Sequence, residues 1–350
     1  MISEIVHIDF LERLDFKDFL ISVSKENESV LGYHFPFYLQ MLENTGVGRF
    51  YGVILKDEKT EQIFGFVPGF LKSSEIGSVY SSMPFFGPNA GLLMSRNRSD
   101  YFEAFSEALN CLENSWDSAA MISASFYTPF NHEGLMMDYQ RALPEALRVD
   151  KFTSYIKLDE LQLSTSLQYD IRKALKSGVE IKSVNDAESA RAIYDIYIQN
   201  CTDYGIPPKS KECIDLLVSQ SSASGNTESY IALVDGKVIG GLIMVYSEKT
   251  ASYYLPCSIH EYRSYQPTTL LIKHSMDLCI ERGLTHWNWE SSPSKDSGVF
   301  KFKQKWGSKE GQYQVLIKAY KEESFFRELG ASKIASYFPH FFVFPFNLLS

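Results

Sequence analysis

The fold is decided by a stretch in the second half of the chain: Tyr230-Ile231-Ala232-Leu233-Val234, then Asp235-Gly236, then Val238-Ile239-Gly240-Gly241-Leu242-Ile243-Met244-Val245. Short apolar runs rich in β-branched residues are typical of buried strands. The Asp-Gly pair favours a tight turn, because both central positions of such a turn take a positive φ. The stretch therefore predicts a β-hairpin.

The residues that follow extend this pattern. A third strand is expected at Ala251-Ser252-Tyr253-Tyr254-Leu255, and a helix over 268–282 is expected after Pro267. Gly283 is a typical helix stop, and a further strand is expected over 285–290. The second half therefore reads as a hairpin, a strand, a helix and a strand.

The first half of the chain repeats this order. Strands are expected over 50–55, 62–67 and 77–82, with a helix entered near Pro88. From Tyr51 to Pro88 is 37 residues, and from Tyr230 to Pro267 is also 37. Matching order and spacing predict an internal duplication. One continuous α/β domain with chance similarity between its halves is the alternative.

The expected fold class is α/β, with two tandem units that are each a mixed, mostly antiparallel sheet flanked by helices. The expected domains are residues 1–158, residues 159–325 and an aromatic C-terminal tail over 326–350.

Composition excludes several classes of protein. The chain has 350 residues, of which 45% are hydrophobic and 22% charged, as in packed globular proteins. Its formal charge of −9 argues against a protein whose whole surface binds nucleic acid, although a local basic groove is compatible with it. The five cysteines form no C-x-x-C pair, the N-terminus is acidic, and no 18-residue apolar run occurs. We therefore expect a cytoplasmic protein with reduced thiols and no metal site.

Three stretches resemble the FemAB (Fem/Lif-type) transferases and their acetyltransferase relatives, which have a duplicated GNAT fold. Ser82-Met83-Pro84-Phe85-Phe86-Gly87 resembles a loop of their first half, and residues 170–178 (DIRKALKSG) resemble a helix end. Residues 298–307 (GVFKFKQKWG) resemble their late F-K element. The resemblance implies two GNAT-like units, with the donor site in the second.

The resemblance implies an enzyme that transfers an acyl or aminoacyl group onto a primary amine of a cell-envelope precursor. The acceptor would be a peptidoglycan stem peptide or an amino sugar. No tightly bound cofactor is implied; the donor would be aminoacyl-tRNA or acyl-CoA. GNAT enzymes that use acetyl-CoA bind its pyrophosphate with a glycine-containing loop at a helix N-terminus. The corresponding residues 262–268 have no glycine, and Pro267 lacks an N–H donor, which weakens CoA as the donor.

Amine acylation passes through a tetrahedral oxyanion, so it needs a nearby cation or N–H donors and a route for the amine proton. Lys303 lies at the F-K position and is the expected catalytic cation. If its segment is a strand, Lys301 and Lys305 lie on the same side and bind substrate. An amphipathic strand with solvated lysines is the alternative.

Further candidates come from other elements. Glu290, at a strand end, is the expected acceptor of the amine proton, although such a carboxylate is more often simply solvated. Arg172 and Lys176 share a helical face suited to phosphate, or form an ordinary charged helix end. One of Tyr253 and Tyr254 should face the cleft. The resemblance places Lys209 at the acceptor's diphosphate, and Ser82 is a candidate acceptor contact.

Three alternatives remain for the whole protein, and one of them is a CoA-dependent N-acetyltransferase. A non-catalytic binding protein that kept the duplicated fold would have Lys301, Lys303 and Lys305 all in bulk water. A peptide-tailoring transferase for a secondary metabolite is the third. The aromatic tail over 337–346 either packs on its own domain or on a partner subunit, which we favour, or contacts a membrane interface. Oligomeric state is not predicted.

Overall fold

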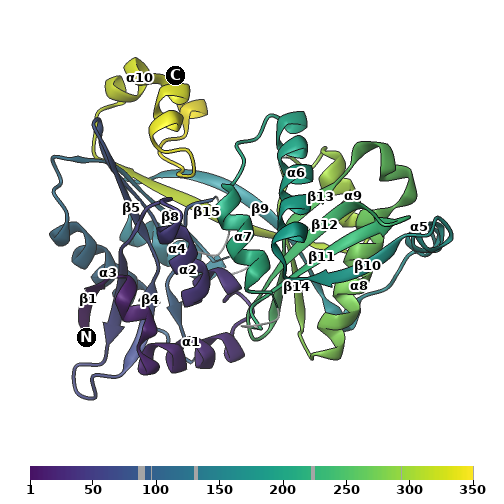
Figure 1. Cartoon of the computed structure of the whole chain (residues 1–350). Helices are drawn as coiled ribbons and strands as arrows, with labels where there is room; N and C mark the ends of the chain where they lie inside the picture. The colour runs from purple at the N-terminus through teal and green to yellow at the C-terminus, as the bar shows by residue number, and fades with distance from the viewer. Residues whose placement is uncertain (86–90, 96, 130–132, 222–224, 293, 350) are drawn as a thin grey trace. The chain divides into compact units, whose positions relative to one another are not determined.

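The computed structural model describes residues 1–349, except 86–90, 96, 130–132, 222–224 and 293. The chain forms two compact units, coloured along the chain in Figure 1. Unit 1 comprises Met1–Phe152 and Gly311–Ser350, and unit 2 comprises Thr153–Glu310. Each unit contains a mixed, mostly antiparallel sheet flanked by helices, so the expected fold class is confirmed.

Unit 2 is built on strands in the order β10-β11-β12-β13-β14-β9. Neighbouring strands are antiparallel, except that β13 and β14 are parallel. The strands are β9 (Leu147–Lys157), β10 (Glu180–Val184), β11 (Thr227–Val234), β12 (Lys237–Tyr246), β13 (Thr250–Ser258) and β14 (His286–Ser291). The parallel pair extends only from Thr250 and His286 to Ser252 and Asn288, so the two strands separate beyond this point.

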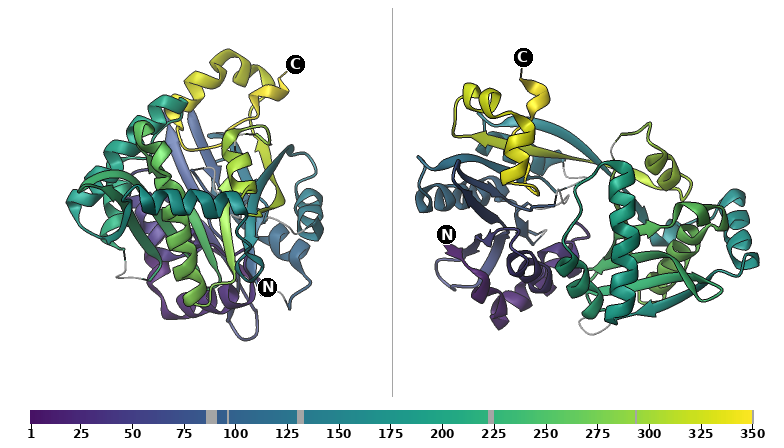
Figure 2. Two further views of the ribbon diagram at one scale, coloured as in Figure 1. Left: turned by 90° about the vertical axis from the view of Figure 1, so that its right-hand side faces the viewer. Right: turned by 45° about the horizontal axis from the view of Figure 1, so that its top comes forward.

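Helices cover both faces of this sheet. The helical elements are η3 (Leu158–Glu160), α5 (Thr165–Lys176), α6 (Ala187–Tyr204), α7 (Lys211–Ser219), η4 (His260–Tyr265), α8 (Pro267–Glu281) and α9 (Gly298–Gln304). Adjacent glycines on β12 identify the faces: a Cβ on Gly240 would contact Leu271 of α8, and one on Gly241 would contact Ile193 of α6. Since neighbouring strand residues point to opposite faces, α8 and α6 cover opposite sides. Figure 2 shows α5 lying across α8.

The hairpin and the helix predicted in this half are confirmed. Asp235 and Gly236 have φ values of 50° and 77°, as the tight turn between β11 and β12 requires. Helix α8 begins at Pro267, whose ring suits the first helical position, and Gly283 follows its end with φ 77°.

Unit 1 has two sheets, with strand orders β1-β3-β4-β7 and β15-β8-β6-β5-β2. The strands are β1 (Ile2–Val6), β2 (Arg49–Phe50), β3 (Gly52–Lys56), β4 (Ile63–Val67), β5 (Phe70–Ser74), β6 (Gly77–Ser81), β7 (Leu93–Met94), β8 (Met121–Tyr127) and β15 (Lys309–Ala319). The helical elements are η1 (Ile8–Glu12), α1 (Leu14–Glu26), η2 (Gly32–His34), α2 (Pro36–Asn44), α3 (Tyr101–Ser115), α4 (Glu133–Ala142), α10 (Glu323–Tyr337) and η5 (Phe346–Leu348). Strands β6 and β8 are parallel, as β13 and β14 are in unit 2.

The first half departs from the predicted repeat in one respect. The hairpin β3–β4 belongs to the smaller sheet, and an additional strand, β5, precedes the predicted strand β6. Pro68 and Gly69 lie between β4 and β5 and interrupt what would otherwise be one long strand. The part before them, β4, belongs to the smaller sheet, and the part after them, β5, belongs to the other sheet. The predicted helix start at Pro88 lies outside the described residues, and the next described helix is α3.

The two units exchange their last strands. Strand β9 follows α4 of unit 1 but pairs with β14 of unit 2. Strand β15 follows α9 of unit 2 but pairs with β8 of unit 1. The chain therefore returns to unit 1 at Gly311, earlier than the boundary expected at residue 325.

The aromatic tail packs within unit 1. Phe338, Phe341 and Phe344 are buried, and the ring of Phe344 stacks on Phe326 of α10 with centroids 4.0 Å apart. The amide of Phe85 donates to the carbonyl of His340. In the described part of the chain, no helix is long and apolar enough to cross a membrane.

Candidate active site

The separation of β13 from β14 opens the sheet of unit 2 where several predicted residues lie. Beyond Asn288, the backbone of β14 turns sharply, because Glu290 has a φ of 61°. Its pairing with β9 is irregular between Asn288 and Ser291. A non-glycine residue with this φ is strained and often marks a functional site. Glu290 thus lies at an irregular point of the strand, beside the place where the sheet opens.

Lys303 reaches this point from α9. Its side chain is 3% exposed, and its Nζ donates to the carbonyl oxygens of Glu290 and Ser291 at 2.8 and 2.9 Å. Burial lowers the pKa of Lys303 to about 8, although the nearby carboxylate of Glu290 favours the charged form. Lys303 is therefore a buried cation near neutral pH that loses its charge under mildly alkaline conditions.

The segment around Lys303 is a helix, which corrects the strand assumed from the sequence. Ser297 caps α9 by accepting from the amide of Phe300 at 3.2 Å. Along a helix alternate residues do not share a face, so Lys301 and Lys305 do not lie beside Lys303. Both are exposed. The arrangement that would mark a mere binding protein, with all three lysines in water, is absent because Lys303 is buried.

Asn288 positions Glu290. Its side chain is fully buried, and its Nδ2 donates to Oε1 of Glu290 at 2.6 Å. Its Oδ1 accepts from the backbone N–H of Glu290 at 3.1 Å. Further bonds join Asn288 to Ser252 and Thr153. The sequence analysis missed Asn288, although its alternation with Trp287 and Trp289 indicated that it faces the opposite side of the strand from the tryptophans.

Lys209 and Tyr254 lie on the α6–α7 side of the same region. The Nζ of Lys209 is 5.2 Å from the ring centroid of Tyr254, within cation–π range. The backbone N–H of Lys209 donates to the hydroxyl of Tyr197 at 3.0 Å. Burial lowers the pKa of Lys209, and Cys213, Cys201 and, least of the three, Glu290 partly oppose this shift. Glu290 therefore acts electrostatically on both Lys209 and Lys303.

The two adjacent tyrosines have different surroundings. Tyr253 packs against Trp287 and Trp289 in the buried cluster beneath α8, where burial raises the pKa of its phenol. Tyr254 is partly exposed beside Lys209. Of the two, Tyr254 is the residue available to a ligand.

Three other predicted residues have surroundings of their own. Arg172 and Lys176 are exposed on α5, and no described contact joins either to Glu290 or Lys303. Ser82 belongs to unit 1 and is buried, with its Oγ accepting from the amide of Tyr127 at 3.0 Å. This hydrogen bond to a backbone amide of β8 indicates a structural role for Ser82 within unit 1.

The loop before α8 keeps a left-handed residue without a glycine. Gln266 has a φ of 59° and immediately precedes the helix. Its Oε1 accepts from the hydroxyl of Thr269 at 3.2 Å. A glycine would adopt this conformation at no steric cost. Gln266 therefore forms the backbone turn at the start of α8. Pro267, the first residue of the helix, has no N–H to donate to a ligand.

Residues 163–289 match the family model described as an acetyltransferase (GNAT) domain. The greater part of unit 2 is therefore similar to a GNAT acetyltransferase domain. The match lies entirely within unit 2, and it agrees with the acyltransferase class predicted for this domain. No curated protein matches the sequence.

Solved structures extend the likeness to the whole chain. FemX is 13% identical with a TM-score of 0.64, covering 93% of this chain and 99% of its own. L-PGS from Bacillus licheniformis is 11% identical with a TM-score of 0.56, covering 83% and 90%. A tandem GNAT protein from the clavulanic acid biosynthesis pathway is 10% identical with a TM-score of 0.55, covering 92% and 100%. The chain therefore has a FemAB-like duplicated GNAT fold.

Proposed function

We propose that this protein transfers an acyl or aminoacyl group onto a primary amine of a cell-envelope precursor, with the chemistry centred on Lys303. The observation that carries the proposal is a buried lysine held beside the opening of the sheet in a GNAT domain. Similarity of fold to FemX and L-PGS supports aminoacyl transfer as the reaction type. A peptidoglycan stem peptide or an amino sugar is the proposed acceptor.

The proposed step begins with the acceptor amine. Its nitrogen attacks the acyl carbon, a C–N bond forms, and the carbonyl electrons move onto oxygen. Glu290 accepts the proton that the nitrogen loses. An ammonium has three N–H donors, and two of those on Lys303 are bound to carbonyls. We assign the third to the oxyanion, since one such donor contributes roughly 10²–10³-fold in kcat.

The intermediate collapses when the bond from the acyl carbon to the leaving group breaks. In an aminoacyl ester this is a C–O bond, and the ribose oxygen takes a proton from Lys303. Glu290 then returns its proton to Lys303, so the protons balance. In this proposal Lys209 contacts the acceptor's diphosphate, with Tyr254 beside it.

An aminoacyl ester is favoured over a CoA thioester as the donor. The helix start that would bind a pyrophosphate has Gln266 and Pro267, so it lacks one N–H and presents a side chain where glycine permits close approach. A CoA-dependent N-acetyltransferase is the second candidate.

The test combines each donor class with each acceptor class. Charged tRNA and acyl-CoAs are incubated with nucleotide-linked amino sugars or stem peptides, and products are identified by mass spectrometry. We expect an acceptor whose mass increases by one acyl or aminoacyl group. Saturable acceptor binding with no product from any donor would instead identify a non-catalytic binding protein.

A further inference from the structure

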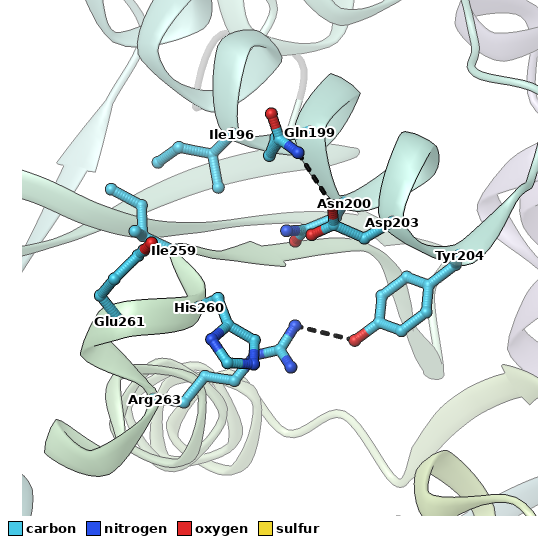
Figure 3. Close-up of a pocket in the computed structure, with 9 residues that line it drawn as sticks. All are labelled: Ile196, Gln199, Asn200, Asp203, Tyr204, Ile259, His260, Glu261 and Arg263. Carbon is cyan, nitrogen blue, oxygen red and sulfur yellow. Dashed lines mark hydrogen bonds between the residues drawn. The ribbon is translucent and has the colours of Figure 1, made fainter.

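Unit 2 contains a cavity of about 580 Å³ whose lining residues do not include Lys303, Glu290 or Lys209. One wall is the C-terminal part of α6, and the other is the segment 259–263 (Figure 3). Its volume lies within the range of about 300–1,000 Å³ that is typical of small-molecule sites. Arg263 belongs to the loop that corresponds to the pyrophosphate-binding loop of acetyl-CoA enzymes, but the proposed transfer gives the cavity itself no role.

Two contacts hold the walls of the cavity together. The amide of Asn200 donates to the carbonyl of Ser258 and accepts from its N–H, both at 3.0 Å. The guanidinium of Arg263 donates to the hydroxyl of Tyr204 at 2.8 Å (Figure 3). The cavity is therefore formed without a ligand, and binding would need little ordering of its walls.

Opposite charges line this cavity without neutralising one another. Arg263 contributes a guanidinium, and Asp203 and Glu261 contribute carboxylates. Among the residues that the structure describes, none of these three groups forms an ion pair within 4.0 Å. Arg263 bonds instead to a neutral phenol, and Asp203 accepts from the neutral amide of Gln199 at 2.8 Å.

The remaining lining supplies an apolar surface. Ile196 of α6 and Ile259 at the start of the opposite wall both face the cavity (Figure 3). The cavity therefore offers a cation, two anions and an apolar surface. This combination suits a ligand that carries both a positive and a negative charge and an aliphatic group.

We propose that this cavity binds a zwitterionic dipeptide with apolar side chains. Its carboxylate would bind Arg263, a pairing that can be bidentate, and its ammonium would bind Asp203. A side chain would pack on Ile196 and Ile259. The cavity is larger than a single amino acid requires, and a dipeptide carries one charge at each end, so that one end can bind Arg263 on the segment 259–263 and the other Asp203 on α6. The proposal does not depend on the transfer reaction.

Isothermal titration calorimetry with four probes tests the proposal. Leu-Leu has both charges, N-acetyl-Leu-Leu lacks the ammonium, Leu-Leu-amide lacks the carboxylate, and leucine is the shorter zwitterion. We expect Leu-Leu to bind the full-length protein and each blocked analogue to bind about tenfold more weakly or worse, because a hydrogen bond between charged groups is lost. Leucine should bind more weakly than Leu-Leu.

Variants then assign the charges. Arg263→Gln should bind Leu-Leu and Leu-Leu-amide equally, and Asp203→Asn should bind Leu-Leu and its N-acetyl form equally. Matched controls on α6 are Arg191→Gln and Asp195→Asn, which form an ion pair of their own and do not line the cavity. These should bind as the wild type does. Tyr204→Phe, which releases Arg263 from the phenol, should retain Leu-Leu binding and show that the fold is intact.

Three results would overturn the proposal. They are the absence of saturable Leu-Leu binding to the wild type, equal wild-type affinity for Leu-Leu and Leu-Leu-amide, and unchanged selectivity in Arg263→Gln.

Discussion

A buried lysine is an unusual cation, because burial removes the water that stabilises its charge. Lys303 partly replaces that water with the carbonyls of Glu290 and Ser291. With a pKa of about 8 it is mostly protonated at pH 7, and it loses its charge within the range in which enzymes are readily assayed. Its contribution to the reaction is therefore open to titration.

The advantage of the wild type over Lys303→Ala should fall as the pH rises through about 8. The protonated form carries the charge and is populated below that pH, so the cation is lost above it. Initial transfer rates of both proteins would be measured from about pH 6.5 to about pH 9.5. The ratio of the two rates cancels the ionisation of the acceptor amine, and a ratio that is flat over this range would refute a role for the charge.

Asn288→Ala should impair both stability and transfer. The substitution leaves buried partners of Asn288 unsatisfied, which lowers the free energy of unfolding by about 1–3 kcal/mol. It also frees the Glu290 carboxylate, so kcat should fall while KM changes little. Urea unfolding and steady-state kinetics measure the two effects. Ser252→Ala removes a single partner and should have a smaller effect on each; an unchanged kcat in Asn288→Ala would limit Asn288 to a structural role.

Sequence reasoning located part of this cluster and missed part. Lys303, Glu290, Lys209 and Tyr254 come together in unit 2, although no single segment contains them. The grouping of Lys301 and Lys305 with Lys303 assumes a strand, in which alternate residues share a face. The signal for a helix was Ser297, whose side chain caps the start of α9.

At the scale of elements, the start of α8 makes a prediction about backbone strain. Gln266 has a left-handed conformation that costs an L-residue about 1–2 kcal/mol. Gln266→Gly should therefore have a free energy of unfolding about 1 kcal/mol higher than Gln266→Ala. Both variants lose the acceptor for Thr269, so the comparison isolates the Cβ. Urea unfolding measures the difference, and equal stabilities would contradict the strain.

The local sequence is sufficient to predict the elements whose ends are marked by turn-forming residues, helix-starting proline or helix-stopping glycine. Asp235-Gly236 defines the turn of a hairpin, and Pro267 with Gly283 defines the limits of α8. The division of one long strand into β4 and β5 was not predictable in the same way. It depends on the two sheets that the strand joins, and their partners lie far away in the sequence.

At the scale of the molecule, strands β9 and β15 lie at the limits of the two units. Strands β9 and β15 each pair in the unit opposite to the one that precedes them in the chain. A repeat in the sequence predicts the order of the elements in each unit. It does not predict in which of the two units a strand at the boundary forms its hydrogen bonds. The C-terminal residues consequently belong to unit 1.

Phe326→Ala should destabilise unit 1 strongly. Phe326 is fully buried and stacks on Phe344, so its truncation should lower the free energy of unfolding by about 3–5 kcal/mol. Hydrogen exchange resolved by peptide should show faster exchange in α10 and β15. If the tail were instead a membrane contact that does not support the fold, unfolding and exchange in water would be unchanged.

The most direct test of the central claim is the transfer rate of Lys303→Ala beside that of Lys273→Ala. Lys273 lies on α8 of the same unit and pairs with Asp277, outside the candidate active site. Saturating donor and acceptor would be used, with acceptor binding measured separately. We expect Lys303→Ala to lose roughly 10²–10³-fold in kcat while it still binds the acceptor, and Lys273→Ala to retain the wild-type rate. Equal rates for the two variants would contradict the assignment of Lys303 as the catalytic cation.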